Sequence, residues 1–361
     1  MTLPRILTIM GSGETAPTMV STHRRLTSLL PSPVRAVVLD TPYGFQENAP
    51  ELAERAVEYF ATSANVELLV AGLTRMQPDD RGISPDAVTI ERGLRMVDEA
   101  NYVFAGPGSP TYSLRQWSNT PLRSLLIRKL HTGGVVTFAS AAALTLGRRT
   151  VPVYEIYKAG SDPYWLEGLD VLGEFGIAAT VIPHYDNAEG GHHDTRFCYL
   201  GERRLAALEA ELPDSAHVIG IDEHTGVVID VDADTATVIG NGTITVRKRG
   251  RSTTHASGTV VPLDALRNPS GGKVVTAGAP AVKEPETVAL SLVDDIVVAE
   301  QKFNDAIARG DSAEAVRAAL ELEDAIRSWS ADTLQSDAMD RAHAALRSMI
   351  VRLGEAAVQG L

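Results

Sequence analysis

One stretch near the middle of the chain reads Val135-Val136-Thr137-Phe138-Ala139-Ser140-Ala141-Ala142-Ala143. Its first part is a run of apolar and β-branched residues, which favours a buried strand, and its last part consists of small helix-forming residues. A serine stands where the two patterns meet. The stretch therefore predicts a strand, a turn at Ser140 and then a helix.

Similar apolar runs occur before this stretch and alternate with amphipathic segments. We expect helices over Pro50–Ala61 and Ser84–Ala100, where apolar residues can share one helix face. Strand–helix alternation predicts an α/β domain with a mostly parallel sheet flanked by helices, and such sheets bind ligands beyond the carboxyl ends of their strands. The expected strands are Ile6–Met10, Ala36–Leu39, Leu68–Ala71, Tyr102–Ala105 and Val135–Ala139.

After this region the expected strands follow one another more closely. Asn241-Gly242 predicts a hairpin between the last two of them, because both residues tolerate the positive φ of a tight reversal. We expect a small antiparallel addition here, with the basic run Arg247–Arg251 as a polar tip and nucleic-acid contact as a minor alternative. The strands are Ala178–Ile182, His217–Ile221, Gly226–Asp230, Thr235–Ile239 and Thr243–Arg247.

The C-terminal part has a different composition. Residues 268–285 are rich in Gly, Pro and small residues and are interpreted as a linker between an α/β domain, 1–267, and a helical region, 286–361. Three amphipathic helices are expected in that region. Their apolar faces must be buried in a bundle of their own, on the α/β domain or in a homo-oligomer.

Composition narrows the class of protein. Apolar residues make up 44% of the 361 residues, which suffices for a large core, and the net charge of −13 disfavours a nucleic-acid partner. The single cysteine, Cys198, excludes an intrachain disulfide. The apolar run near the N-terminus is short for a signal peptide, and Leu130–Gly147 is too interrupted by polar residues and glycine for a membrane span. We expect a cytoplasmic protein without membrane contact.

Three residues at predicted strand ends and turns could carry chemistry. Ser140 at a strand-to-helix turn is similar to a nucleophile elbow, in which the hydroxyl projects from the sheet. His184 follows the apolar strand Val181-Ile182, where an imidazole can act as a general base on a serine. Glu155 lies between them in the sequence and is our candidate for orienting the histidine.

Two glycine turns follow predicted strands. The segment from Gly106 to Gly108 precedes a helix, so its backbone N–H groups could face an anion or an oxyanion. Neither it nor Gly11-Ser12-Gly13 completes a nucleotide-binding fingerprint, and we expect no cofactor. A local metal site is a weaker alternative, because the spacing fits no standard site. It would use His184, Asp186, His192, His193 and Asp194.

Together these segments resemble the dipeptidase E and cyanophycinase family of serine peptidases, which has a class I glutamine amidotransferase-like fold. The likeness covers roughly residues 1–265. It rests on Ser140-Ala141 and on four further segments: Gly106–Gln116, Pro183-His184-Tyr185 with Glu202-Arg203-Arg204-Leu205, Val218-Ile219-Gly220-Ile221-Asp222-Glu223 and, less specifically, Thr41-Pro42-Tyr43-Gly44.

The resemblance implies a role for each candidate residue. Ser140 would be the nucleophile, His184 the base and Glu155 the third member of the triad, with Glu223 as the alternative acid. Gly108 and Ala141 would supply the N–H groups of an oxyanion hole. The candidates on the substrate side are Ser109, Asn187 and Glu223.

The chain departs from the family at the elbow, which there reads Gly-x-Ser-Ala-Gly. Phe138 and Ala142 replace the two glycines, and Pro107 replaces another glycine and removes one N–H donor. Phe138 must point into the core or reshape the turn. The resemblance implies a serine hydrolase that cleaves a small peptide or amide, next to aspartate, through an acyl-enzyme. The alternative is a catalytically impaired member that binds a partner through the helical tail.

Overall fold

The computed structural model describes residues 3–190, 193–269 and 273–274, and in the C-terminal part residues 299, 302–303, 306–307, 309, 314–320, 322, 343–350 and 352–353. The chain divides into two compact units, Met1–Ala277 and Gly278–Leu361. The expected linker and the three expected C-terminal helices lie mostly outside the described residues. In the second unit, a buried cluster of mainly small apolar side chains includes Ala315, Ala319 and Met349.

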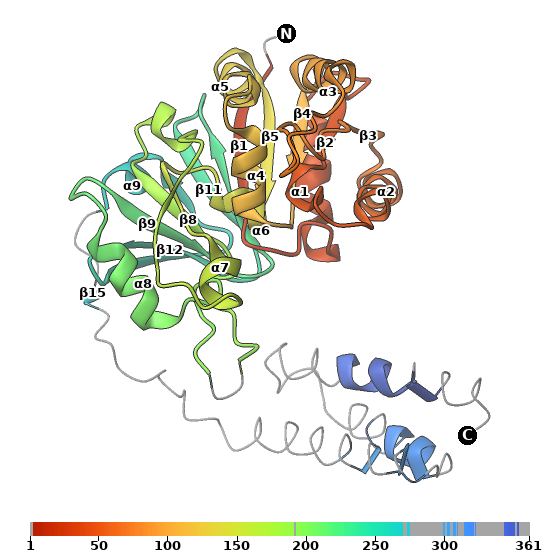
Figure 1. Cartoon of the computed structure of the whole chain (residues 1–361). Coiled ribbons are helices and arrows are strands. Elements are labelled where there is room, and N and C mark those ends of the chain that lie inside the picture. Colours follow the sequence, from red (N-terminus) through yellow and green to blue (C-terminus); the bar gives the residue numbers. More distant parts are fainter. Residues whose placement is uncertain are drawn as a thin grey trace. The chain divides into compact units, whose positions relative to one another are not determined.

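An eight-stranded sheet runs through the first unit (Figure 1) in the order β14-β11-β10-β1-β5-β4-β2-β3. The five strands from β1 to β3 pair in parallel, and β10, β11 and β14 continue the sheet antiparallel. The predicted α/β class with a mostly parallel sheet is confirmed. The bounds are β1 Arg5–Met10, β2 Ala36–Leu39, β3 Leu68–Val70, β4 Tyr102–Ala105, β5 Gly134–Ala139, β10 Thr225–Asp230, β11 Thr235–Gly240 and β14 Val260–Pro262.

Helices cover both faces of the parallel part, because alternate residues of each buried strand point to opposite sides. Leu7 packs in the cluster that holds Val97 of α3 and Leu126 of α5, whereas Ile6 packs in the cluster of Leu26 of α1. Both faces of these strands are therefore apolar. The helices are α1 Pro17–Ser28, α2 Ala49–Tyr59 with its continuation η2 Phe60–Ala64, α3 Ala87–Glu99, α4 Pro110–Trp117 and α5 Leu122–Thr132.

A second sheet of five strands lies beside the first, in the order β15-β13-β12-β9-β8. Ile219 of β9 and Val246 of β12 share one buried cluster with Val227 and Ile229 of β10, so the two sheets pack on a common core. The strands are β8 Ala179–Ile182, β9 His217–Ile221, β12 Thr243–Lys248, β13 Arg251–Ala256 and β15 Lys273–Val274. The strands that follow residue 177 are thus distributed over two sheets.

The predicted hairpin at Asn241-Gly242 is wrong. The strands on either side of it, β11 and β12, belong to different sheets, and the segment crosses from one sheet to the other. Asn241 N donates to His224 O at 3.0 Å, and Gly242 N donates to Thr225 Oγ1 at 2.8 Å. Asn241 and Gly242 can adopt the backbone of a tight turn, but this preference does not determine which strands pair on either side of them. The hairpin that forms joins β12 and β13 through Arg249-Gly250, both with positive φ.

The basic run Arg247–Arg251, which begins within β12, is not a uniformly polar tip either. The side chain of Arg247 is only 3% exposed and forms ion pairs with Glu202 at 2.6 Å and Glu209 at 3.0 Å, both on α8 Gly201–Ala210. A buried charge needs such partners to offset its lost hydration. Arg247 therefore ties the second sheet to α8.

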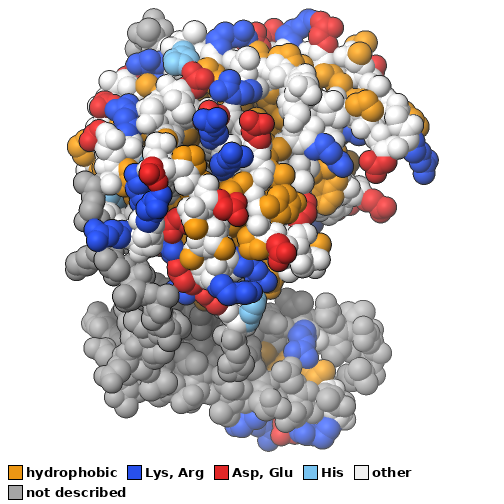
Figure 2. All heavy atoms as spheres, turned by 60° about the vertical axis from the view of Figure 1, so that its left-hand side comes forward, with side chains coloured by type: hydrophobic (Ala, Val, Ile, Leu, Met, Phe, Trp, Pro, Cys, Tyr) orange, Lys and Arg blue, Asp and Glu red, His pale blue; other side chains and the backbone are white. Residues whose placement is uncertain are grey.

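The remaining elements are short. They are η1 Thr41–Tyr43, α6 Ser140–Leu144, β6 Arg149–Thr150, α7 Val153–Tyr157, β7 Leu166–Glu167, η3 Leu172–Phe175 and α9 Asp264–Arg267. Acidic and basic side chains are interspersed over the visible face of the first unit (Figure 2). Among the residues that the structure describes, no helix has the length and apolar character needed to cross a bilayer.

Candidate active site

Ser140 is the first residue of α6 and follows β5 directly. Its φ is 49°, in the left-handed region that a residue with a Cβ rarely occupies. Such a conformation costs roughly 1–3 kcal/mol and persists only where the surrounding structure enforces it. The serine is half-buried at the carboxyl end of the strand. This is the strand-turn-helix geometry that the sequence pattern predicts.

His184 approaches Ser140 from the second sheet. It follows β8, and its Nε2 lies 3.0 Å from Ser140 Oγ, within hydrogen-bonding distance. The backbone around it is held by neighbouring segments, since Cys198 N donates to His184 O at 3.1 Å and Tyr185 N donates to Ile221 O at 3.0 Å. The structure thus brings the predicted serine and histidine together, across two sheets.

Glu223 completes a line of three side chains. It follows β9, the neighbour of β8, and its Oε1 lies 2.8 Å from His184 Nδ1. The pKa of the Glu223 carboxyl is lowered, mainly by its hydrogen bond with His184. A second hydrogen bond, from Asn187, acts in the same direction. Glu223 N donates in turn to Asp186 Oδ1 at 2.7 Å. The carboxylate therefore favours the charged form at neutral pH and stands where it can stabilise an imidazolium.

Glu155 is not part of this line, which corrects our first choice of acid. It lies on α7, and its Oε2 accepts a hydrogen bond from Thr111 Oγ1 at 3.0 Å. The alternative acid, Glu223, is the residue on Nδ1 of His184. Chain order suggested Glu155, but the pairing of β8 with β9 puts the later glutamate beside the histidine.

Two of the candidates on the substrate side have structural partners. Asn187 is 1% exposed, and its Nδ2 donates to Glu223 Oε1 at 3.3 Å. Ser109 caps α4, with its Oγ accepting from Tyr112 N at 3.1 Å and its own N donating to Pro42 O at 2.8 Å. Asn187 is therefore placed to position Glu223, whereas Ser109 also lines a pocket described below.

The candidate oxyanion residues lie on either side of the elbow. Gly108 has a φ of +143°, and a Cβ built on it would stand 1.9 Å from Pro42 O, so only glycine fits there. Ala141 follows Ser140 at the start of α6. Ala142 N donates to Gly106 O at 3.2 Å, which ties the glycine turn to the elbow.

The residues that depart from the family pattern are accommodated. Phe138 is fully buried, and its ring packs against Trp117 at 6.0 Å between centroids. Phe138 therefore points into the core, which is the first of the two arrangements expected from the sequence. Ala142 is also fully buried, and Pro107 is exposed at the outside of the glycine turn.

Glu14 is a member of this region that our sequence reasoning did not single out. Its side chain is buried at 7% exposure, and its Oε1 would lie 3.3 Å from a Cβ on Gly106. Burial raises the pKa of this carboxyl, against smaller lowering effects that include the charges of His184 and His224. The available signal was an acidic residue directly after a glycine turn at a strand end.

The side chains of the alternative metal site have other partners where they are described. Asp194 pairs with Arg196 at 2.9 Å, and Asp186 accepts from the backbone of Glu223. His192 lies outside the described residues. In the described part of the chain no group of three or more His, Cys, Asp or Glu side chains is arranged to hold a metal ion.

Comparison with known proteins gives a likeness in structure alone. No family model matches the chain, and no curated protein is similar to it. The crystal structure of a peptidase from an acI-B1 actinobacterium aligns with a TM-score of 0.56 and 21% identity, covering 72% of this chain and 98% of that one. A candidate peptidase E from Listeria monocytogenes EGD-e aligns with a TM-score of 0.44 and 12% identity, covering 66% of this chain and 98% of that one. The first alignment shows a shared fold.

Proposed function

We propose that the chain is a serine hydrolase that cleaves a small peptide or amide through an acyl-enzyme. The observation that carries the proposal is the continuous line from Ser140 Oγ to His184 Nε2 at 3.0 Å and from His184 Nδ1 to Glu223 Oε1 at 2.8 Å. Nucleophile, base and orienting acid in this geometry define hydrolases with a catalytic triad on many folds. The fold shared with a peptidase and the family resemblance add support.

The first half of the reaction forms the acyl-enzyme. Ser140 Oγ attacks the carbonyl carbon while its proton passes to His184 Nε2, and the charge of Glu223 stabilises the imidazolium. Backbone N–H groups of Gly108 and Ala141 are the proposed donors to the oxyanion. When the tetrahedral intermediate collapses, the C–N bond breaks and His184 gives its proton to the leaving nitrogen.

The second half releases the acid. A water molecule gives a proton to His184 Nε2 and attacks the ester carbon. The C–O bond to Ser140 then breaks, and the proton returns from His184 to the serine oxygen. The left-handed backbone at Ser140 supports this role, since it turns the hydroxyl toward His184 at the end of the sheet.

A fluorophosphonate probe tests the proposal without knowledge of the substrate. We expect it to label the full chain at Ser140, as located by peptide mass spectrometry, and Ser140→Ala and His184→Ala to abolish labelling. Ser28→Ala is the matched control, because Ser28 is exposed at the end of α1. Absence of labelling between pH 6 and 9 would count against the hydrolase and favour the binding role.

A further inference from the structure

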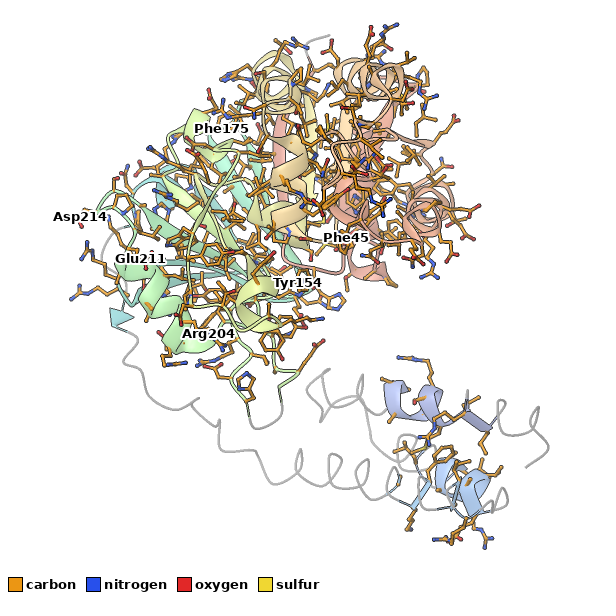
Figure 3. All side chains as sticks on the ribbon, viewed as in Figure 1. Phe45, Tyr154, Phe175, Arg204, Glu211 and Asp214 are labelled. Carbon is orange, nitrogen blue, oxygen red and sulfur yellow. The ribbon has the colours of Figure 1, made fainter. Side chains whose placement is uncertain are left out.

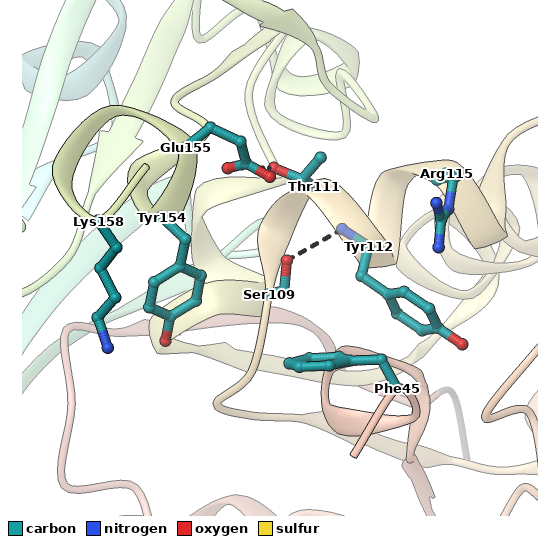
Figure 4. A pocket seen from close by; sticks show the side chains of 8 residues that line it. All are labelled: Phe45, Ser109, Thr111, Tyr112, Arg115, Tyr154, Glu155 and Lys158. Carbon is teal, nitrogen blue, oxygen red and sulfur yellow. Dashed lines mark hydrogen bonds between the residues drawn. The ribbon is translucent and has the colours of Figure 1, made fainter. Parts of the chain in front are cut away.

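A hollow of about 540 Å³ lies at the turn that carries the candidate oxyanion donor (Figure 4). It is formed by the start of α4, by α7 and by Phe45, which follows η1. Ser109, the residue after Gly108, lies on its wall. Gly106 of the same turn accepts the Ala142 N–H, so the turn that borders the hollow contacts α6, the helix that begins at Ser140.

Three of the eight residues that line the hollow are aromatic. The rings of Phe45 and Tyr112 lie 5.3 Å apart between centroids, and Tyr154 faces them across Ser109 (Figure 4). Phe45 is 51% exposed and Tyr154 is 41% exposed, although both line the same hollow. Figure 3 labels the two side chains. Exposed aromatic side chains gathered in a hollow are typical of a site that an apolar ligand group covers.

The wall is also held in place. Tyr112 Oη donates to Thr74 O at 2.8 Å, and Tyr112 N is fixed by the cap of α4. A ring with a fixed orientation loses little conformational freedom when a ligand packs against it. The hollow is thus preformed on this side.

The charged side chains of the hollow already have partners. The Arg115 guanidinium lies over the Tyr112 ring at 5.3 Å, and Lys158 Nζ lies over the Tyr154 ring at 5.3 Å. The carboxylate of Glu155 accepts from Thr111. Two cations thus face aromatic rings and one carboxylate is hydrogen-bonded, so the hollow combines three rings with charges of both signs.

We propose that this hollow is the specificity pocket of the hydrolase and takes an aromatic side chain next to the scissile bond, rather than the aspartate that the family resemblance implies. The inference rests on the proposed function. An aromatic group would stack on the rings of Phe45 and Tyr154, and edge-to-face or offset contacts of this kind add to the gain from apolar burial.

Dipeptide hydrolysis by the full chain tests the pocket. The substrates are Phe-Ala, Ala-Phe, Asp-Ala, Ala-Asp and Ala-Ala, with products measured by chromatography. We expect one phenylalanyl dipeptide to have a kcat/KM about 10-fold above that of Ala-Ala and of both aspartyl dipeptides, since covering a phenyl group gains on the order of 1–2 kcal/mol. Aspartyl dipeptides cleaved faster than phenylalanyl ones would overturn the inference.

Phe45→Ala is the matched variant, because Phe45 is exposed and its removal leaves the core intact. It should lower kcat/KM for the phenylalanyl dipeptide about 10-fold, mainly through KM, and by a larger factor than it lowers kcat/KM for Ala-Ala. Tyr164→Ala is the control, since this exposed tyrosine does not line the hollow. An equal loss on all dipeptides, or no loss, would refute the assignment.

A binding measurement separates failure of the pocket from failure of the hydrolase. N-acetylphenylalanine amide and N-acetylaspartate amide are added to the Ser140→Ala chain, and binding is followed by saturation-transfer NMR. Preferred binding of the phenylalanine probe, lost in Ser140→Ala/Phe45→Ala, supports the pocket even if fluorophosphonate does not react. Labelling of Ser140 without preference for the phenylalanine probe overturns the pocket and leaves the hydrolase standing.

Discussion

Replacement of Glu223 by glutamine is expected to slow the reaction of Ser140 with fluorophosphonate about 100-fold, whereas Glu155→Gln should change the rate less than threefold. The two glutamates are the rival acids of the site. Glu223 Oε1 lies 2.8 Å from His184 Nδ1, and the Glu155 carboxylate instead accepts from Thr111. The variants remove the same charge at two places that the structure distinguishes.

The magnitude follows from the charge that His184 acquires when it takes the serine proton. Two opposite charges about 4 Å apart attract by roughly 4 kcal/mol at an effective dielectric constant of about 20. The side chains of His184 and Glu223 are 22% and 31% exposed, so water screens part of this attraction. A remainder of about 3 kcal/mol corresponds to roughly 100-fold in rate.

The assay is the pseudo-first-order rate of fluorophosphonate labelling at pH 8, measured by in-gel fluorescence for both variants and the unaltered chain. The lowered pKa of Glu223 keeps this carboxylate charged at that pH, so the assay removes an actual charge. Urea unfolding midpoints check that each variant is folded.

Two results would refute the reasoning. A Glu155→Gln rate as low as that of Glu223→Gln would restore the first choice of acid, and require a conformation in which α7 approaches His184. A Glu223→Gln rate within threefold of the unaltered chain would show that the negative charge of Glu223 does not contribute to the reaction of Ser140.

Three further predictions concern single positions. The free energy of unfolding of Ser140→Gly should exceed that of Ser140→Ala by about 1 kcal/mol, because glycine accepts the φ of 49° without strain. Urea unfolding measures this difference, and equal urea midpoints would argue against a strained elbow. Gly108→Ala should lose labelling and about 1–3 kcal/mol of stability, since its Cβ would stand 1.9 Å from Pro42 O; a variant as stable and reactive as the original would contradict this close approach. Burial raises the pKa of Glu14 in the folded chain above its value of about 4.5 in the unfolded chain. The protonated carboxyl therefore contributes fully to the free energy of unfolding below pH 4.5, and this contribution is lost as pH rises through the folded-state pKa. Glu14→Gln should therefore gain stability relative to the original chain between pH 5 and pH 8 in urea titrations, and a difference independent of pH would refute the shift.

Much of the first unit was predictable from local patterns. The run Val135–Ala139 contains only apolar residues and threonine, and a strand buried on both faces is what such a run favours. The same pattern predicted Ser140 at the end of that strand. His184 was predicted for the same reason, since it follows the apolar strand that ends at Ile182.

The contact between Glu223 and His184 was not predictable in this way. His184 and Glu223 are separated by 39 positions, and they meet because β8 and β9 pair in parallel and end at the same edge. Arg247 shows the same limit, since a basic run at a turn looks like a solvated tip, yet its guanidinium is buried between two glutamates of α8. Both contacts depend on how distant segments pack.

By itself the amino-acid sequence determined most of the strands of the two large sheets, several helices and the turn that presents Ser140, because apolar periodicity and backbone preference act between near neighbours in the chain. Only the tertiary structure decided that the strands after residue 177 divide between two sheets and that Glu223 rather than Glu155 contacts the histidine. Strand pairing and sheet packing depend on the summed burial of side chains far apart in the sequence, so no local pattern records their outcome.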